Sequence, residues 1–125
     1  MFDAQITFLS VTDLDASSRF YTEGLGLEMV LDQQRCRIFR SAATSYIGIC
    51  DLRTPDPGSS IVTLVTEDVD GVHDRLVSIG ATIDVPPRAN PDFQIYQLFA
   101  RDPDGYVIEA QRFDDPRWST RSPPD

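Results

Sequence analysis

The two halves of this sequence repeat one pattern of apolar, acidic and glycine residues. In each half a short β-branched run precedes an acidic segment, an amphipathic stretch that ends at glycine, and three further apolar runs. Superposing the halves pairs these positions: Ile6 with Ile61, Leu9 with Leu64, Asp13 with Asp68, Leu14 with Val69, and Gly26 with Gly80. A half of this size cannot bury a sheet alone, so the two halves must combine their sheets. The repeat therefore predicts an α+β fold of two β-α-β-β-β modules, which form a curved, eight-stranded mixed sheet with a concave cavity.

Clusters of turn-forming residues set the boundaries that we predict within one domain over 1–125. The first module is expected over about 5–53, and a linker rich in proline, glycine and serine over 54–59. The second module is expected over about 60–113. The remaining segment, 114–125, is rich in proline, serine and charged residues, so we expect a flexible tail.

Helices are predicted near 15–24 and 70–80, where apolar residues recur every three or four positions after an acidic N-cap segment. The eight strands are expected in the apolar and β-branched runs over 6–11, 27–31, 35–40, 46–52, 61–66, 81–85, 93–101 and 106–113. A stiff loop is expected at 86–91, because three of its residues are proline.

Charge and composition exclude several classes of function. With 11 basic and 20 acidic residues the net charge is −9, which disfavours binding to nucleic acids and to acidic membrane surfaces. No apolar run is long enough to span a bilayer, and no secretory signal is expected, so a cytoplasmic location is predicted. The single histidine, His73, cannot supply a metal site built from several imidazoles.

Three segments resemble the vicinal oxygen chelate superfamily, which includes glyoxalase I, extradiol dioxygenases, fosfomycin-resistance enzymes and bleomycin-resistance proteins. They are Val-Thr-Asp-Leu-Asp-Ala-Ser-Ser-Arg-Phe-Tyr at 11–21, Gly-Leu-Gly-Leu at 24–27, and Arg-Asp-Pro-Asp-Gly-Tyr-Val-Ile-Glu at 101–109. The resemblance supports the same paired-module fold. It implies less about function, because one fold can carry many activities.

The resemblance also implies where metal ligands would lie. Metal-dependent members place a histidine or glutamine at the positions occupied here by Ile6 and Ile61, which have no lone pair to donate. A third ligand could come from Cys50 or Asp51, and only Glu109 matches the carboxylate of the last strand. These are too few ligands for tight binding of a first-row metal, so no cofactor or metal is expected.

Glu109 is the candidate catalytic residue, because it lies in an apolar strand where burial would suit it to acid–base work or to pairing with a cation. An ordinary ion pair with Arg37 or Arg88 is an equally good interpretation. Pairing Arg101 with Tyr106 across the turn at 102–105 would place Tyr96 and Gln111 on the face of Glu109, whereas a bulge would place Gln97 there instead. The predicted ligand-binding residues are Phe8, Arg37, Tyr46, Arg88, Tyr96 and Gln111.

Cys36 and Cys50 are nearly symmetric about the turn at 41–45, so they are expected to face each other across a hairpin. Two buried thiols are favoured over a disulfide, because a reducing compartment is predicted. Arg35 and Arg37 are close enough in sequence to activate a thiolate but are expected to point away.

The favoured function is a metal-free small-molecule-binding protein that resembles bleomycin-resistance proteins, with a cationic drug as one ligand and antibiotic resistance as one role. The alternative is an isomerase or lyase of the glyoxalase type that uses Glu109 as acid and base. A dioxygenase is disfavoured, because it would need an iron site. As in the family that it resembles, the chain is expected to form a homodimer around its cavities.

Overall fold

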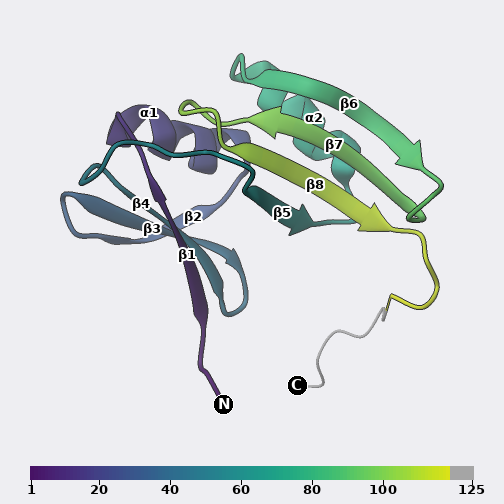
Figure 1. The fold of residues 1–125 in the computed structure, drawn as a ribbon, viewed down its shortest axis with the longest axis horizontal. Helices are drawn as coiled ribbons and strands as arrows, with labels where there is room; N and C mark the ends of the chain where they lie inside the picture. Colours follow the sequence, from purple (N-terminus) through teal and green to yellow (C-terminus); the bar gives the residue numbers. More distant parts are fainter. Residues whose placement is uncertain (119–125) are drawn as a thin grey trace.

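The eight strands form two four-stranded sheets of identical topology (Figure 1). The computed structural model describes residues 1–118. The first sheet has the order β1-β4-β3-β2 and consists of β1 (Gln5–Ser10), β2 (Glu28–Asp32), β3 (Cys36–Ala42) and β4 (Ser45–Cys50). The second has the order β5-β8-β7-β6 and consists of β5 (Ile61–Val65), β6 (Thr82–Asn90), β7 (Ile95–Arg101) and β8 (Val107–Phe113). The α+β class and the two β-α-β-β-β modules are confirmed, with the strands divided between two sheets.

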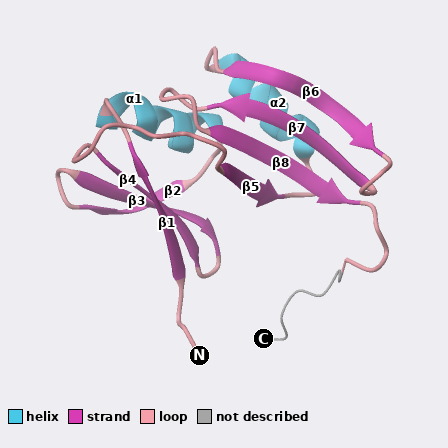
Figure 2. Ribbon diagram, in the orientation of Figure 1, coloured by secondary structure: helices cyan, strands magenta, loops and turns pink. Residues whose placement is uncertain are grey.

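Each sheet is mixed, since its first and last strands pair in parallel while the other pairs are antiparallel. β1 pairs with β4 and β5 pairs with β8 in parallel, so both modules close in the same way. The helical segments are α1 (Leu14–Arg19), which continues as the π-helical turn η1 (Phe20–Gly24), and α2 (Val69–Ser78). Figure 2 shows α1 and α2 on the same side of the molecule, and η1 contacts α2.

The helices begin where the repeat places its aspartates. The Asp13 carboxylate accepts hydrogen bonds from the backbone N–H groups of Asp15 and Ala16, at 2.9 and 3.1 Å. Asp68 accepts one from Gly71 at 2.9 Å. Capping oxygens of this kind satisfy donors that the first helical turn leaves unpaired, so the two acidic segments fix both helix starts.

Each sheet has a buried face that packs on the helices and an opposite face, which we call the open face. The Phe39 ring of β3 lies on the buried face, 5.9 Å from the ring of Tyr21 in η1. The core residues of the second sheet, on β7 and β8, are Leu98, Ala100, Ile108 and Ala110. Their sequence neighbours lie on the open face, because side chains alternate along a strand.

A turn between β7 and β8 joins the two modules. The Tyr21 hydroxyl donates a 2.7 Å hydrogen bond to the carboxylate of Asp102, which is only 4% exposed. Asp104 of the same turn accepts a hydrogen bond from the Thr12 N–H at 3.1 Å, and the Tyr106 hydroxyl donates one to the carbonyl oxygen of Ser10 at 2.9 Å. The start of α1 in the first module is therefore tied to the last hairpin of the second.

The buried Asp102 carboxyl gives a testable pH dependence. Its burial raises the pKa above the ordinary value, against the opposing effect of the hydrogen bonds from Tyr21 and Tyr106. A carboxyl whose pKa is higher in the folded state than in the unfolded state contributes to stability at pH values below its unfolded-state pKa. That contribution is lost as the pH rises through the folded-state pKa. We expect the stability of Asp102→Asn relative to wild type to increase with pH over this range. Urea unfolding at a series of pH values measures it, and a pH-independent difference would contradict it.

The segment predicted as a proline-rich loop is part of a strand. β6 runs through Pro86 and Pro87 to Asn90, with register shifts between Ile83 and Val85 and between Val85 and Arg88. Proline is tolerated here because β6 is an edge strand, and its residues at irregular positions need not donate to a neighbour. No helix within residues 1–118 has the length and apolar character needed to cross a membrane.

Candidate functional site

Strand β8 places a carboxylate on the open face of the second sheet. Glu109 is 8% exposed and pairs in register with Thr63 of β5 and Phe99 of β7. Its neighbours Ile108 and Ala110 belong to the core, so Glu109 and Gln111 lie on the opposite face. The sequence pattern of β8 predicts this alternation.

Four polar side chains, one from each strand of the second sheet, form a hydrogen-bonded row across its open face. The Thr63 hydroxyl donates to one oxygen of Glu109 at 2.7 Å, and the Gln97 amide donates a short hydrogen bond to the other oxygen. Asn90 of β6 in turn donates to the side-chain oxygen of Gln97 at 2.9 Å. We call Asn90, Gln97, Glu109 and Thr63 the polar row. Its direction of donation suits an ionised Glu109, since a carboxylate accepts hydrogen bonds at both oxygens.

Neither hydrogen-bond partner of Glu109 carries a positive charge. Within the described part of the chain, the arginine ion pairs involve other carboxylates. The interpretation of Glu109 as the partner of Arg37 or Arg88 is therefore wrong for this structure. Both hydrogen bonds to Glu109 come from neutral side chains.

The predicted register between β7 and β8 was one residue out. Asp102 pairs with Tyr106 through its backbone N–H, which leaves a three-residue loop that ends at Gly105 with a φ of 92°. A loop of this length carries a glycine in the left-handed region, and Arg101 then pairs with Val107. A shift of one residue turns each side chain of β7 to the other face. Gln97 therefore contacts Glu109 in place of Tyr96. The sequence predicts Gln97 on this face only if the strand contains a bulge.

Two of the predicted ligand-binding residues lie on the helix side of their sheets. Tyr96 donates a 2.6 Å hydrogen bond to Asp70 of α2. Arg37 of β3 donates to Asp15 at 2.9 Å and to Ser18 at 2.8 Å, both in α1. Their placement beside Glu109 was wrong, because register and strand alternation direct both side chains to the helices.

The remaining predicted residues lie on the open faces but on different sheets. Arg88 is exposed, and its register partner on β7 is Gln97. Gln111 is the register partner of Gln97 on β8, so both residues lie on the open face of the second sheet. On the first sheet the ring of Phe8 lies against Gly48, where a Cβ atom would collide with it. Tyr46 is on the same face, with the guanidinium of Arg40 5.3 Å from its ring centre. Within one chain, Phe8 and Glu109 therefore belong to separate surfaces.

Sequence reasoning missed Thr63 and Asn90, which complete the polar row. The repeat contains a signal for Thr63, because it occupies the position in the second module that Phe8 occupies in the first. Thr63 is also the one polar residue in the otherwise apolar run Ile-Val-Thr-Leu-Val. Asn90 had no such signal, because the prolines before it indicate a loop.

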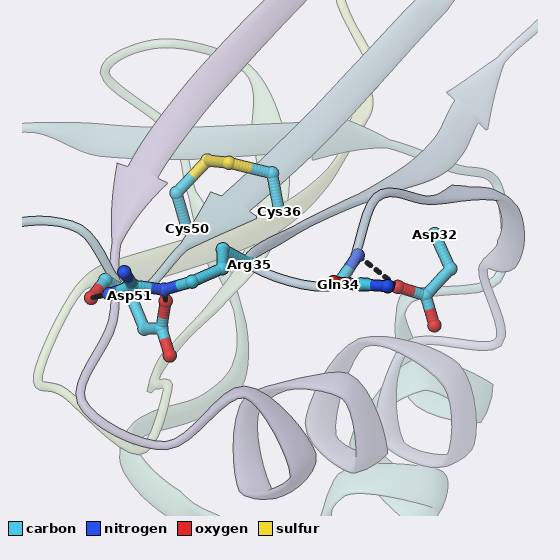
Figure 3. The surroundings of a disulfide bond; sticks show 6 residues. All are labelled: Asp32, Gln34, Arg35, Cys36, Cys50 and Asp51. Atoms are coloured by element: carbon cyan, nitrogen blue, oxygen red, sulfur yellow. Dashed lines mark hydrogen bonds and ion pairs between the residues drawn. A yellow bond between two sulfur atoms is a disulfide. The ribbon is translucent and has the colours of Figure 1, made fainter.

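The two cysteines form a disulfide, and the prediction of two thiols was wrong for this structure (Figure 3). Cys36 and Cys50 are register partners on β3 and β4, with Cα atoms 4.2 Å apart, so the prediction that they face each other is confirmed. Arg35 binds Asp51 beside them, with Nε 2.8 Å from the carboxylate. Arg37 points to α1, so both arginines serve carboxylates and not the sulfur atoms.

The residues do not fit the metal site that the resemblance implies. Ile6 and Ile61 present hydrocarbon side chains where ligands would be required, and both oxygens of Glu109 already accept hydrogen bonds. Among residues 1–118, no group of three or more histidine, cysteine, aspartate or glutamate side chains could hold a metal ion.

Comparison with known proteins gives a consistent assignment. The family model described as Glyoxalase/Bleomycin resistance protein/Dioxygenase superfamily matches residues 4–110. A glyoxalase-related enzyme from Fulvimarina pelagi is 22% identical with a TM-score of 0.75, covering 90% of this chain and 88% of its own. Lactoylglutathione lyase from Agrobacterium tumefaciens is 23% identical with a TM-score of 0.72, and the match covers 92% of this chain and 95% of that one.

A third similar structure is the fosfomycin resistance protein FosX from Listeria monocytogenes. It is 17% identical with a TM-score of 0.73, and the match covers 90% of this chain and 93% of that one. At these identities the three structures show a shared fold. Together with the family match over most of its length, they show that the chain belongs to the glyoxalase/bleomycin resistance protein/dioxygenase superfamily.

Proposed function

We propose that this protein binds a small cationic ligand, without a metal, at the open face of its second sheet. The observation that carries the proposal is Glu109, a buried carboxylate whose hydrogen-bond partners are both neutral. A buried charge is costly unless it is paired, and hydrogen bonds alone offset only part of that cost. A ligand cation next to Glu109 would supply the missing charge.

The surroundings of Glu109 also suit a ligand with an apolar or aromatic body. Phe99 is its register partner, and the neighbouring residues of β5 on the same face are Ile61 and Val65. Aromatic faces attract cations, and apolar surface gains from the burial of a ligand's hydrocarbon. The net charge of −9 would also attract a cation at long range.

The ligand-binding role predicts a specific loss of affinity. We expect Glu109→Gln to keep the fold, because the amide oxygen still accepts a hydrogen bond, but to weaken binding of a cationic aromatic compound at least about ten-fold, or roughly 1.4 kcal/mol. The compound is first found by thermal shift in a panel of cationic aromatic drugs that includes bleomycin, each compared with a neutral analogue. Its affinity is then measured by calorimetry.

The matched control is Glu23→Gln, which removes the same charge from an exposed carboxylate in η1. If both variants weakened ligand binding equally, the loss of affinity would arise from the change in net charge and not from the site. Unchanged binding by Glu109→Gln would overturn the site. Parallel titration with divalent cations tests the metal-free part of the proposal, because a metal that binds the native state raises the unfolding midpoint.

Acid–base catalysis is the second candidate, of the isomerase or lyase type. It is favoured by the low exposure of Glu109 in a row of hydrogen-bonding side chains, an environment in which a carboxyl group can exchange a proton with a substrate. It agrees with the name of the similar lactoylglutathione lyase. In this case Glu109→Gln would abolish turnover while leaving substrate affinity nearly unchanged, which distinguishes catalysis from binding alone. An antibiotic-resistance role is a further form of the binding proposal.

We also propose that two copies associate through their open faces. Phe8 on the first sheet is 56% exposed, and Ile61 and Val65 on the second sheet are 54% and 52% exposed. Each open face therefore carries large apolar side chains in contact with solvent, as interaction surfaces do. A second copy would cover them and could bring the Phe8 surface of one chain over the polar row of the other.

We propose a cytoplasmic homodimer. Light scattering is therefore expected to give the mass of a dimer. Phe8→Asp should shift that mass toward the monomer, since a charge would be buried at the contact. Val77→Asp, at an exposed apolar residue of α2, is the control and should stay dimeric. A monomer at all working concentrations would contradict the association.

A further inference from the structure

The Cys36–Cys50 disulfide joins two residues that the sheet already holds together. Its cysteines are direct register partners in the β3–β4 hairpin, separated by 14 positions in sequence. Their Cα atoms are 4.2 Å apart, as expected for the closely spaced, non-hydrogen-bonded positions of an antiparallel pair. The bond therefore links no distant segments, unlike a cross-link that fixes the arrangement of a fold.

Other contacts hold the backbone on both sides of the sulfur atoms. The Asp51 N–H donates to the Arg35 carbonyl at 3.1 Å, and the Arg35 guanidinium binds the Asp51 side chain and carbonyl at 2.8 and 2.9 Å (Figure 3). The Val11 N–H donates to the carbonyl of Cys50 at 2.9 Å, which fixes β4 to β1 at the same level. If the disulfide opened, these bonds would keep the two thiols facing each other.

The two cysteines also lie outside the buried interior. Both cysteines are only half-buried, and neither belongs to the hydrophobic core. Cys50 lies two residues along β4 from Gly48, so it shares the open face on which the Phe8 ring lies. In a single copy of the chain, a thiol in solution can approach this face, whereas a buried structural disulfide is protected from attack.

We propose that Cys36 and Cys50 form a reversible thiol–disulfide site that small or protein thiols open and close in the folded protein. An attacking thiolate forms a mixed disulfide with one cysteine and releases the other as a thiolate, which takes up a proton. A second attacking thiolate then displaces the first cysteine, giving two cysteine thiols and one disulfide of the reductant. Two electrons pass from the reductant to the protein in this exchange, and oxidised reductant reverses it.

The exchange does not depend on the ligand proposed above, but it would change the surface available to one. The closed form presents a disulfide on the open face of the first sheet, and the open form presents two S–H groups on that face, which also carries Phe8. Ligands and soft electrophiles that contact this face would therefore distinguish the two forms.

The site is tested by equilibrating the native protein with reduced and oxidised glutathione at graded ratios, trapping thiols with iodoacetamide, and counting adducts by mass spectrometry. Since the chain has two cysteines, each adduct reports on this pair. We expect zero adducts at the oxidising end and two at the reducing end, with unchanged far-ultraviolet circular dichroism and full return on reoxidation. The Cys36→Ser variant should form one mixed disulfide with glutathione at Cys50.

Two results would overturn the proposal. One is that thiols appear only after denaturant is added, which would show a protected structural bond. The other is that reduction itself abolishes the circular dichroism signal. The Cys36→Ser/Cys50→Ser double variant is the matched control for the second result, and its retention of the native spectrum would support the proposal by showing that the fold does not need the bond.

Discussion

Replacing Asp102 with alanine is expected to lower the free energy of unfolding by about 3 kcal/mol or more. The carboxylate accepts hydrogen bonds from the Tyr21 hydroxyl at 2.7 Å and from the backbone N–H groups of Tyr106 and Asp104 at 2.9 and 3.0 Å. Alanine would leave these donors without their acceptor, and a buried donor left unpaired costs about 1–3 kcal/mol. The loss should be visible in urea unfolding as a lower midpoint.

Two variants show whether the loss arises from the hydrogen bonds. Asp102→Asn retains an acceptor oxygen and should lose less than alanine, while Asp92→Ala removes an exposed carboxylate and should change stability by less than about 0.5 kcal/mol. If Asp102→Ala behaved like Asp92→Ala, the turn would not join the two modules in the way that the structure indicates.

Phe39→Ala is expected to destabilise the protein by about 3–5 kcal/mol, the usual cost of deleting a buried aromatic ring. Phe39 has no exposed surface and packs on Tyr21, so the truncation leaves a cavity between the first sheet and η1. Phe93→Ala is the matched control, because that ring is 70% exposed and its loss should cost little. Equal losses for the two variants would contradict the assignment of Phe39 to the buried face of β3.

The repeat made the fold predictable from sequence because both of its halves carry the same local signals. Asp13 and Asp68 cap their helices as their spacing indicates, and Gly26 and Gly80 adopt positive φ angles just after the helices. These signals are local, since each depends on a few neighbouring residues. Two units with the same signals must also fold alike, so the topology of one module supports that of the other.

The candidate site was harder to predict because it depends on register. One residue in the loop before Tyr106 decides whether Tyr96 or Gln97 faces Glu109, and the sequence of the turn allows either loop length. Arg37 was misplaced for a different reason: both faces of β3 carry an arginine and an apolar residue, Arg37 with Phe39 and Ile38 with Arg40, so the pattern does not show which face meets the helix. The polar row joins four strands that are distant in sequence, so only their pairing in space shows that its members meet.

The proline pair in β6 has a consequence for how copies of this protein meet. An exposed strand edge with free N–H and C=O groups can recruit a strand of another chain, which leads to uncontrolled aggregation. Pro86 and Pro87 lack N–H groups and interrupt the regular pairing at the outer edge of the second sheet. This edge is therefore a poor template for adding strands. The prolines therefore disfavour the growth of fibres along this edge, and contacts between copies are expected to form through the sheet faces instead.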